Sequence, residues 1–201
     1  METSEQKTSS EPAAVIAMDE RRLLPRHRRG DPAAFGELLA LYQAPVFGYL
    51  IRCGVPEGDR DDLFQDIFLK IHGAAATYQA DRPLKPWLFT VVANTVRGYF
   101  RKQKVEQWVY PQNLQDPQPN SQDLLEAGET SHWLKKAIGA LPLAQREVVV
   151  LACLEKLNLN KVAEILDLPL GTVKTHLHRA RLALTRALAR HKTLSEREVC
   201  S

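Results

Sequence analysis

Residues 160–184, with the sequence NKVAEILDLPLGTVKTHLHRARLAL, decide the fold of this chain. A short segment with helical apolar periodicity, NKVAEILDL, is followed by the break PLG and by a second periodic segment that begins at Thr172. A glycine in a three-residue break and a threonine available as N-cap are typical of the turn between two helices. The stretch therefore predicts a helix-turn-helix motif.

The second helix of this motif is predicted to have one apolar face and one basic face. The residues that recur at helical spacing are apolar and should pack inward: Val173, Leu177, Ala180 and Leu184. The residues on the outward arc carry positive or hydrogen-bonding groups: Lys174, Thr175, His178 and Arg179. In a helix-turn-helix, such positions enter the major groove of DNA and reach base edges and phosphates. An ordinary three-helix bundle with a solvated basic face is the alternative interpretation.

The formal net charge of +3 hides a segregation of charge along the 201 residues. Residues 170–193 contain six Lys or Arg side chains and no acidic one, whereas residues 105–130 contain five Asp or Glu side chains and no basic one. This asymmetry indicates a polyanion as the partner of the basic segment.

The rest of the sequence has helical periodicity and no convincing alternating pattern of a strand. The pair Asp31-Pro32 predicts a helix start, and the segment 110–123 has the Pro-, Gln- and Asn-rich composition of a linker. Further helices are expected over about 45–53, 58–78, 86–104, 132–140 and 142–156. We therefore expect an all-α chain of two small helical domains joined by an acidic flexible linker: a disordered tail (1–22), a first domain (23–106), the linker (107–131), a second domain (132–193) and a tail (194–201).

The helix expected over 86–104 carries a second basic surface. Its inward face is formed by Leu88, Val91, Val92, Thr95 and Tyr99. Its opposite face and basic end carry groups that can bind nucleic acid: Thr90, Asn94, Arg97, Arg101 and Lys102. An asparagine between arginines, with aromatic side chains nearby, suits single-stranded or unstacked bases. A polar stripe facing solvent is the alternative interpretation.

The helix expected over 58–78 has two apolar faces. One face is formed by Leu63, Phe64, Ile67 and Ile71. The other places Phe68 and Leu69 among polar groups that include Asp61, Asp62 and Gln65. A surface helix needs only one apolar face, so the second face either docks a protein with basic side chains or shows that the helix is central in its bundle.

The sequence carries no signature of an enzyme or of a bound cofactor. The three cysteines, Cys53, Cys153 and Cys200, are far apart, and the histidines belong to no HExxH-type motif. The uninterrupted apolar runs are shorter than the roughly 18 residues that a bilayer requires, and the N-terminus is polar. We therefore expect a cytoplasmic protein with no catalytic activity, cofactor, metal or direct membrane insertion.

The order of these parts resembles bacterial RNA polymerase sigma factors of the extracytoplasmic-function group, within the sigma-70 family. The resemblance covers about residues 24–188 and lies in four segments: DPAAFGELLALYQAPVFGYLIR, DRDDLFQDIFLKIH, KPWLFTVVANTVRGYFRKQK and LPLAQREVVVLACLEKLNLNKVAEILDLPLGTVKTHLHRARLAL. It implies an alternative sigma factor whose domains 2 and 4 direct promoter-specific transcription initiation. A stand-alone dimeric helix-turn-helix regulator is the alternative interpretation.

The resemblance also implies roles for three groups of residues. The group that binds the −10 element is Asn94, Arg97, Arg101 and Lys102. The group that reads the −35 element in the major groove is Lys174, Thr175, His178 and Arg179. The group that binds core polymerase is Asp61, Asp62, Gln65 and Phe68.

The implied partners are core RNA polymerase, promoter DNA and an anti-sigma factor. Contact with the polymerase would be through the clamp helices of its largest subunit and the flap of the second largest, and the acidic linker would run toward the RNA exit path. The chain departs from the family pattern at Asp66, where glutamate is common, at Asn160-Lys161, where an acidic pair is usual, and at His176 and His178, where arginine or an aromatic is common. The preferred −35 sequence therefore cannot be taken from relatives.

The two histidines also suggest that DNA binding strengthens below about pH 6.5, where histidine becomes charged. An unchanged affinity for −35 duplex between pH 8 and pH 6 would refute this hypothesis.

Overall fold

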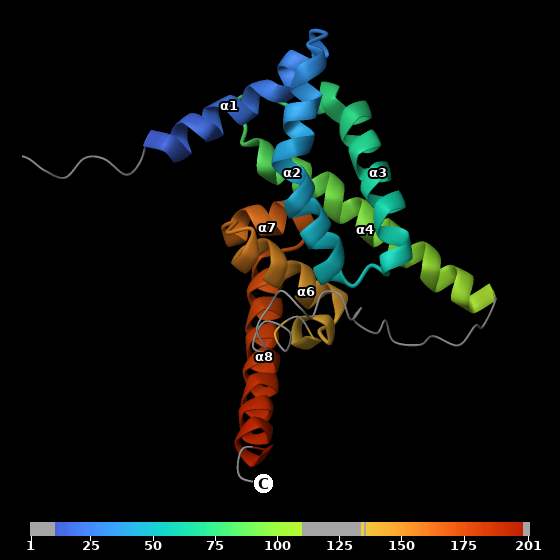
Figure 1. Cartoon of the computed structure of the whole chain (residues 1–201), viewed down its shortest axis with the longest axis vertical. Coiled ribbons are helices and arrows are strands. Elements are labelled where there is room, and N and C mark those ends of the chain that lie inside the picture. Colours follow the sequence, from blue (N-terminus) through green and yellow to red (C-terminus); the bar gives the residue numbers. More distant parts are fainter. Residues whose placement is uncertain (1–10, 110–133, 135, 199–201) are drawn as a thin grey trace, which may run out of the picture.

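The computed structural model describes residues 11–109, 134 and 136–198, and these residues form helices joined by short connections (Figure 1). The elements are α1 (Glu11–Arg28), α2 (Pro32–Cys53), α3 (Glu57–Ala74), the 3-10 turn η1 (Ala75–Thr77), α4 (Leu84–Val109), α6 (Leu143–Val149), the π-helical segment η3 (Val150–Leu154), α7 (Leu159–Leu166) and α8 (Leu170–Glu198). No strand occurs among the described residues, which confirms the all-α prediction. Most of the expected linker, 110–131, lies outside the described residues, as do 1–10 and 199–201.

Helix α1 occupies much of the segment that we expected to be a disordered tail. Its end is tied to the rest of the N-terminal half, because Leu23 and Leu24 are buried. The Arg26 guanidinium donates to the carboxylates of Asp31 and Glu37 over 2.8–2.9 Å. The assignment of residues 11–22 to a disordered tail is therefore corrected. The leucines that hold this helix in place, Leu23 and Leu24, lie just after the expected tail of residues 1–22, so the composition of the tail did not reveal them.

Helix α2 is continuous where the sequence predicted two helices with a break near Pro45. Its start is as predicted: Pro32 is the first helical residue, and the Asp31 carboxylate accepts from the Ala33 N–H at 3.0 Å. A proline inside a helix removes one hydrogen bond, to the carbonyl four residues earlier. That residue, Leu41, is 41% exposed, so water reaches this turn and the helix continues through it.

By length and composition alone, α2 is apolar enough to cross a membrane, although no uninterrupted apolar run in the sequence is long enough. Its apolar residues belong to the core of the N-terminal half. The buried ones are Ala34, Leu38, Tyr42, Val46, Tyr49, Leu50 and Cys53, and α1, α3 and α4 pack around them. The position of α2 in this core accounts for part of this composition, because 33% of the apolar stretch is buried.

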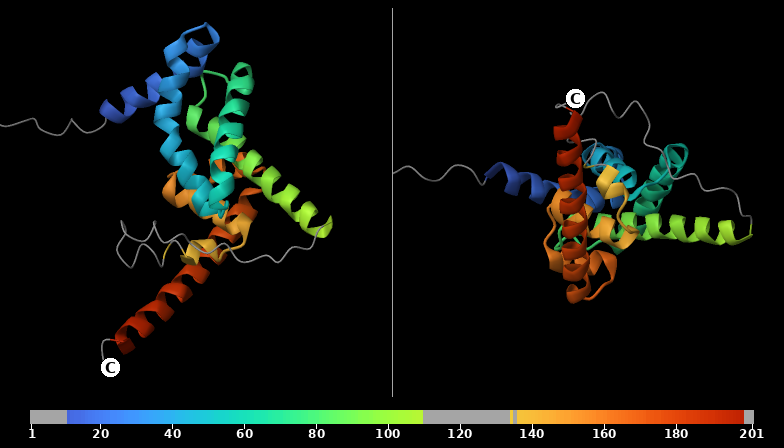
Figure 2. Two further views of the ribbon diagram at one scale, coloured as in Figure 1. Left: turned by 45° about the vertical axis from the view of Figure 1, so that its right-hand side comes forward. Right: turned by 90° about the horizontal axis from the view of Figure 1, so that it is seen from below.

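The predicted helix-turn-helix is present in the C-terminal half as α7 and α8. Asn158 caps α7 through its side-chain oxygen, which accepts from the Lys161 N–H at 2.9 Å. The expected cap at Thr172 is wrong, because α8 already begins at Leu170 and the Val173 N–H donates to the Pro169 carbonyl at 3.1 Å. Helix α8 is long and projects away from the rest of the structure (Figures 1 and 2).

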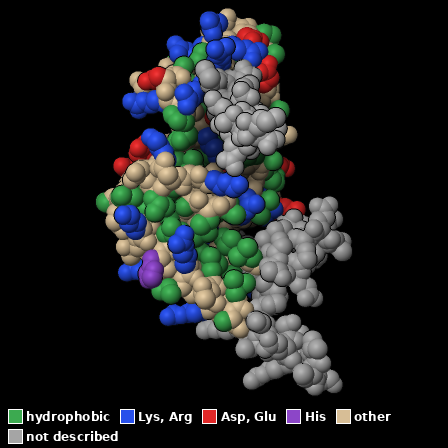
Figure 3. Space-filling view, turned by 90° about the vertical axis from the view of Figure 1, so that its left-hand side faces the viewer, with side chains coloured by type: hydrophobic (Ala, Val, Ile, Leu, Met, Phe, Trp, Pro, Cys, Tyr) green, Lys and Arg blue, Asp and Glu red, His purple; other side chains and the backbone are tan. Residues whose placement is uncertain are grey.

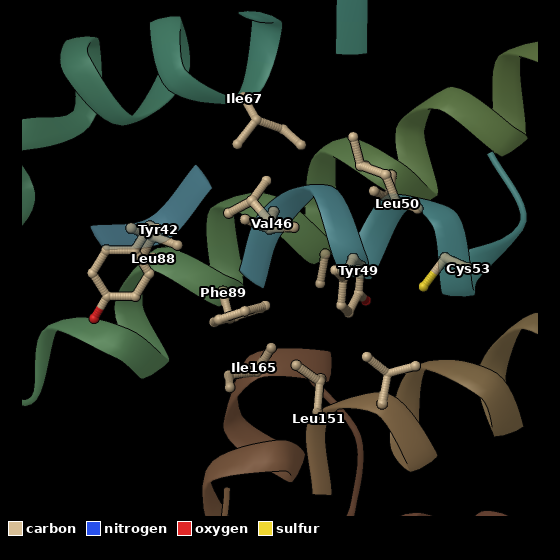
Figure 4. Packing of buried hydrophobic residues seen from close by; sticks show 14 of the residues in the cluster. Tyr42, Val46, Tyr49, Leu50, Cys53, Ile67, Leu88, Phe89, Leu151 and Ile165 are labelled. Carbon is tan, nitrogen blue, oxygen red and sulfur yellow. The ribbon is translucent and has the colours of Figure 1, made fainter. Parts of the chain in front are cut away.

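The two halves pack against each other and share one cluster of buried apolar residues. Helix α7 lies against α4, and α6 lies against α2. Figure 4 shows this junction, where Tyr49 and Phe89 from the N-terminal half face Leu151 and Ile165 from the C-terminal half. The sequence pattern of two linked domains did not predict this contact.

Candidate nucleic-acid interface

The start of α8 presents the basic surface that the sequence predicted. The inward residues Val173, Leu177 and Ala180 are buried. The outward residues are all exposed: Lys174, Thr175, His178 and Arg179. The Thr175 hydroxyl donates to the Gly171 carbonyl at 2.9 Å, so part of its hydrogen-bonding capacity is used within the helix. In Figure 3, the lower part of one face of the molecule shows Lys, Arg and His side chains next to hydrophobic ones.

His176 lies between the two faces of α8 and is half-buried. Its Nδ1 atom is shielded from solvent and has no hydrogen-bond partner among the described residues. His178 is exposed by contrast. The two histidines that depart from the family pattern therefore occupy different surroundings, and His178 is the one positioned on the outward surface.

Helix α4 brings three of the four predicted −10 residues to the surface. Asn94, Arg101 and Lys102 are exposed, whereas Arg97 is half-buried at the contact between the two halves. The Arg97 Nε donates to both carboxylate oxygens of Glu147 at 3.1 Å, and its Nη1 donates to the Leu166 carbonyl at 2.7 Å. The Arg97 guanidinium is therefore hydrogen-bonded to the C-terminal half of its own chain.

Glu147 is a functional candidate that the sequence analysis missed. Its side chain is almost completely buried and accepts from the Tyr49 hydroxyl at 3.3 Å as well as from Arg97. Burial raises the pKa of Glu147, and the neighbouring Arg97 guanidinium and Tyr49 hydroxyl only partly offset this rise. The available signal was a single acid directly before the apolar run VVVL, since a charge beside such a run requires a partner once it is buried.

A second acid, Glu155, makes a similar contact. Lys85, at the start of α4, places its Nζ 2.9 Å from the Glu155 carboxylate and 3.0 Å from the Glu155 carbonyl oxygen. Glu155 is buried, so the two buried acids of the C-terminal half both pair with bases of α4.

Helix α3 presents only part of the predicted polymerase-binding group. Asp61, Asp62 and Gln65 are exposed. Phe68 is 5% exposed and packs against Phe35 and Phe64, with ring centroids 6.4 and 4.7 Å away.

The placement of Phe68 on this surface is therefore corrected. Aromatic partners contributed by α2 and α3 itself hold its ring in the core. Leu69, which is 71% exposed, supplies the apolar group on the outer face instead.

The described residues contain no group of three or more His, Cys, Asp or Glu side chains that could hold a metal ion. Cys53 is buried and Cys153 is exposed, and neither takes part in a disulfide.

Comparison with known families gives two matches along the chain. Residues 38–106 match the family Sigma-70 region 2, and residues 131–184 match the family Sigma-70, region 4. The first range contains α3 and most of α4, and the second contains α6, α7 and the start of α8. The two matched ranges are therefore the ones that carry the candidate surfaces.

Individual relatives match over most of the chain. The ECF RNA polymerase sigma-E factor of Escherichia coli (strain K12) is 29% identical over 174 residues, which cover 81% of this chain and 90% of the relative. The ECF RNA polymerase sigma factor SigW of Bacillus subtilis (strain 168) is 27% identical over 173 residues, covering 80% and 92%. The solved structure of CnrH in complex with the cytosolic domain of CnrY superposes with a TM-score of 0.64 at 27% identity, covering 85% of this chain and 97% of that one.

Proposed function

This chain belongs to the extracytoplasmic-function group of the sigma-70 family, and from that premise we propose which of its surfaces carry out each step of initiation. It is an alternative sigma factor that directs promoter-specific transcription initiation by core RNA polymerase. Residues 23–106 act as domain 2, residues 107–131 as the linker and residues 132–193 as domain 4.

Domain 4 reads the −35 element with the start of α8. The observation that supports this most directly is the exposed outer arc of a helix-turn-helix second helix, with Lys174, His178 and Arg179 all accessible. Groups of this kind at the N-terminal end of such a helix reach base edges in the major groove. Thr175 adds a hydroxyl that can accept from DNA while it donates to Gly171.

Domain 2 binds the −10 element with α4. Asn94 lies exposed in the middle of the helix, and Arg101 and Lys102 both add positive charge about two turns further along. An amide can both donate to and accept from the edge of an unpaired base, and the flanking cations hold the adjacent phosphates. Binding energy spent on unpaired bases favours the opened promoter over the duplex.

The protein partners are core polymerase and an anti-sigma factor. The exposed acids Asp61 and Asp62, together with Gln65 and Leu69, form the α3 surface for the clamp helices of the polymerase, and domain 4 contacts the flap. The relative CnrH is solved in complex with the cytosolic domain of CnrY, which supports an anti-sigma partner for this chain as well. The chain acts in the cytoplasm, as a DNA-binding regulator with no catalytic step of its own.

Run-off transcription from a genomic promoter library tests this function. Purified core polymerase is used with and without the protein, beside a duplex-binding assay of the protein alone. We expect transcripts only when both components are present, from promoters that share two spaced elements. Tight sequence-specific duplex binding with no effect on core polymerase would instead identify a stand-alone regulator.

A further inference from the structure

Helix α1 has an outer face that consists almost entirely of arginines. Its inner face carries Leu23 and Leu24, which are buried against the N-terminal half. At about 100° per residue, the opposite arc of the helix carries Arg21, Arg22, Pro25, Arg26, Arg28 and Arg29. In Figure 3, Lys and Arg side chains gather at the upper end of the molecule, where α1 meets α2 in Figure 1, with a few acidic side chains among them.

The acids around this face neutralise only one of its arginines. Asp31 and Glu37 both pair with Arg26. Glu20, which directly precedes the arginines, accepts from the Tyr42 hydroxyl at 2.9 Å. Within the described part of the chain, four arginines of the face therefore have no ion pair: Arg21, Arg22, Arg28 and Arg29.

These four arginines form two strips along the helix. Arg21 and Arg28 are seven residues apart, so they lie on the same side of α1, about 10.5 Å from each other along its axis. Arg22 and Arg29 repeat this spacing about 100° further around the helix. A length of 10.5 Å corresponds to about three nucleotides of one strand at 3.4 Å each. Each strip can therefore bind two phosphates of the same strand, since a guanidinium matches the geometry of phosphate oxygens.

The strip of Arg21 and Arg28 lies beside the connection that leads into α4. Helix α1 packs against η1, and Tyr78 directly follows η1. Burial raises the pKa of Tyr78 to about 12, and the nearby Arg21 guanidinium partly offsets this rise. The Tyr78 ring in turn contacts the ring of Trp87, with centroids 5.4 Å apart. Trp87 is seven residues before Asn94 and so lies on the same side of α4, which links the strip to the surface proposed for the −10 element.

The arginine face fits nucleic acid better than a membrane surface. A helix that binds in the plane of a membrane buries its apolar face in the lipid. In α1 that face is already occupied, because Leu23 and Leu24 are buried within the protein. The outer face offers only charge and hydrogen-bond donors, which is what a phosphate backbone requires.

From the strip without ion pairs and its position beside Trp87, we infer that Arg21 and Arg28 bind phosphates of the promoter strand whose bases α4 holds. They would do so at the end of α4 opposite Arg101 and Lys102, so the strand is held on both sides of Asn94. The inference rests on the proposed role of α4 at the −10 element. Helix α1 precedes the range 38–106 that matches Sigma-70 region 2, so that match assigns it no role.

The test measures the salt dependence of DNA binding by holoenzyme. The probe is a promoter fork in which the −10 segment is single-stranded. Arg21→Gln combined with Arg28→Gln removes the strip. Arg22→Gln combined with Arg29→Gln is the matched control, because it removes two charges with the same spacing from the other side of the same helix. Arg21→Lys combined with Arg28→Lys keeps the charges of the strip.

We expect the glutamine pair at 21 and 28 to make the slope of log K against log salt shallower by about 1.4, since each phosphate contact with a single strand contributes about 0.7. If the lines meet near 1 M salt, this change corresponds to about 25-fold weaker binding at 0.1 M. The control pair should change the slope by less than half as much, and the lysine pair should keep nearly the wild-type slope.

A wild-type slope for the glutamine pair at 21 and 28, or an equal change in the control pair, would overturn the inference. Two further assays identify the other partners that an arginine face can serve. Weaker binding to core polymerase without DNA would identify a protein contact. Loss of binding to vesicles of equal phosphatidylglycerol and phosphatidylcholine, with an unchanged DNA slope, would identify a membrane contact. Either result would also overturn the inference.

Failure of the proposed function is distinguishable from failure of this inference. If wild-type holoenzyme binds the fork no better than core polymerase alone, the proposed function fails. The salt slope of the free protein on a single-stranded oligonucleotide then still reports whether Arg21 and Arg28 bind phosphates.

Discussion

At the residue scale, the outward arc of α8 provides the simplest test of base reading. We expect Arg179→Ala to cost about 1–3 kcal/mol of binding to the −35 element, because an exposed guanidinium that makes a good base contact contributes this much. Competition binding to promoter duplexes measures the loss. Arg186→Ala is the matched control, since Arg186 is also exposed but lies further from the start of the helix. Equal losses for the two variants, independent of sequence, would contradict base reading by Arg179.

Asn94 tests the recognition of unpaired bases separately from duplex binding. Asn94→Ala should leave duplex binding unchanged and impair promoter opening, because the amide is exposed on α4 and positioned for an extruded base. A 2-aminopurine fluorescence assay with holoenzyme follows the opening. Gln43→Ala is the control, since it removes an exposed amide on α2, outside the α4 surface. Normal opening by Asn94→Ala would refute this role.

Glu147 makes the contact between the two halves dependent on pH. Its pKa is raised where the halves are in contact, mainly by burial, with Arg97 and the Tyr49 hydroxyl facing it. A group with a raised pKa binds protons more tightly in that arrangement, so the contact gains stability as pH falls through the raised pKa and loses it as pH rises.

Resonance energy transfer between a dye at R28C and a dye on Cys153, two exposed positions in different halves, should therefore increase in a C200S background on acidification from pH 8 toward the ordinary glutamate pKa of about 4.3. Glu147→Gln removes the titrating group and should flatten this dependence. A slope that persists in Glu147→Gln would assign the effect to another group.

At the element scale, α3 tests the polymerase surface. Asp62→Lys should weaken binding to core polymerase by roughly 1 kcal/mol or more. The substitution replaces an exposed acid by a base, which would repel the basic side chains expected on the polymerase. Surface plasmon resonance with immobilised core polymerase at two salt concentrations measures the loss and its electrostatic origin. Asp81→Lys makes the same charge change at an exposed acid outside α3. A comparable loss in Asp81→Lys would point to net charge and not to this surface.

The helices show where sequence periodicity is sufficient and where it is not. The inward positions of α8, from Val173 to Ala180, and the Asp31-Pro32 start of α2 were predicted correctly, because both depend on residues close together in sequence. The exposed position of Phe68 was wrong, because an aromatic neighbour on another helix, Phe35, decides its burial.

The candidate DNA-binding residues also differ in whether the local sequence predicts their surroundings. Lys174 and Arg179 lie on the outer arc as expected, since helical geometry alone places them there. Arg97 does not lie free on its helix, because Glu147 is fifty residues away in sequence and no local pattern links the two. Contacts between the halves were the part that a single sequence could not predict.

At the scale of the whole molecule, Gly54 lies where the two halves meet, because the Arg146 guanidinium of the C-terminal half donates to the neighbouring Cys53 carbonyl at 2.5 Å. Gly54→Ala should destabilise the protein by about 1 kcal/mol or more, because its φ of 83° is strained for alanine and the added Cβ displaces Arg146. Urea denaturation measures the change. Gly36→Ala is the control inside α2, the helix that Gly54 caps; no atom lies within 4 Å of the new Cβ, and alanine should stabilise the helix by up to about 1 kcal/mol. Destabilisation of equal size in both variants would contradict this account.

The apolar contact between the two halves also has a consequence for unfolding. Buried residues of α2 and α4 belong to the same cluster as buried residues of α6, α7 and α8. Two domains without a shared core can lose their structure in separate transitions, whereas residues of one cluster lose their packing together. We therefore expect one cooperative unfolding transition for the two halves, with the same midpoint by calorimetry and by circular dichroism.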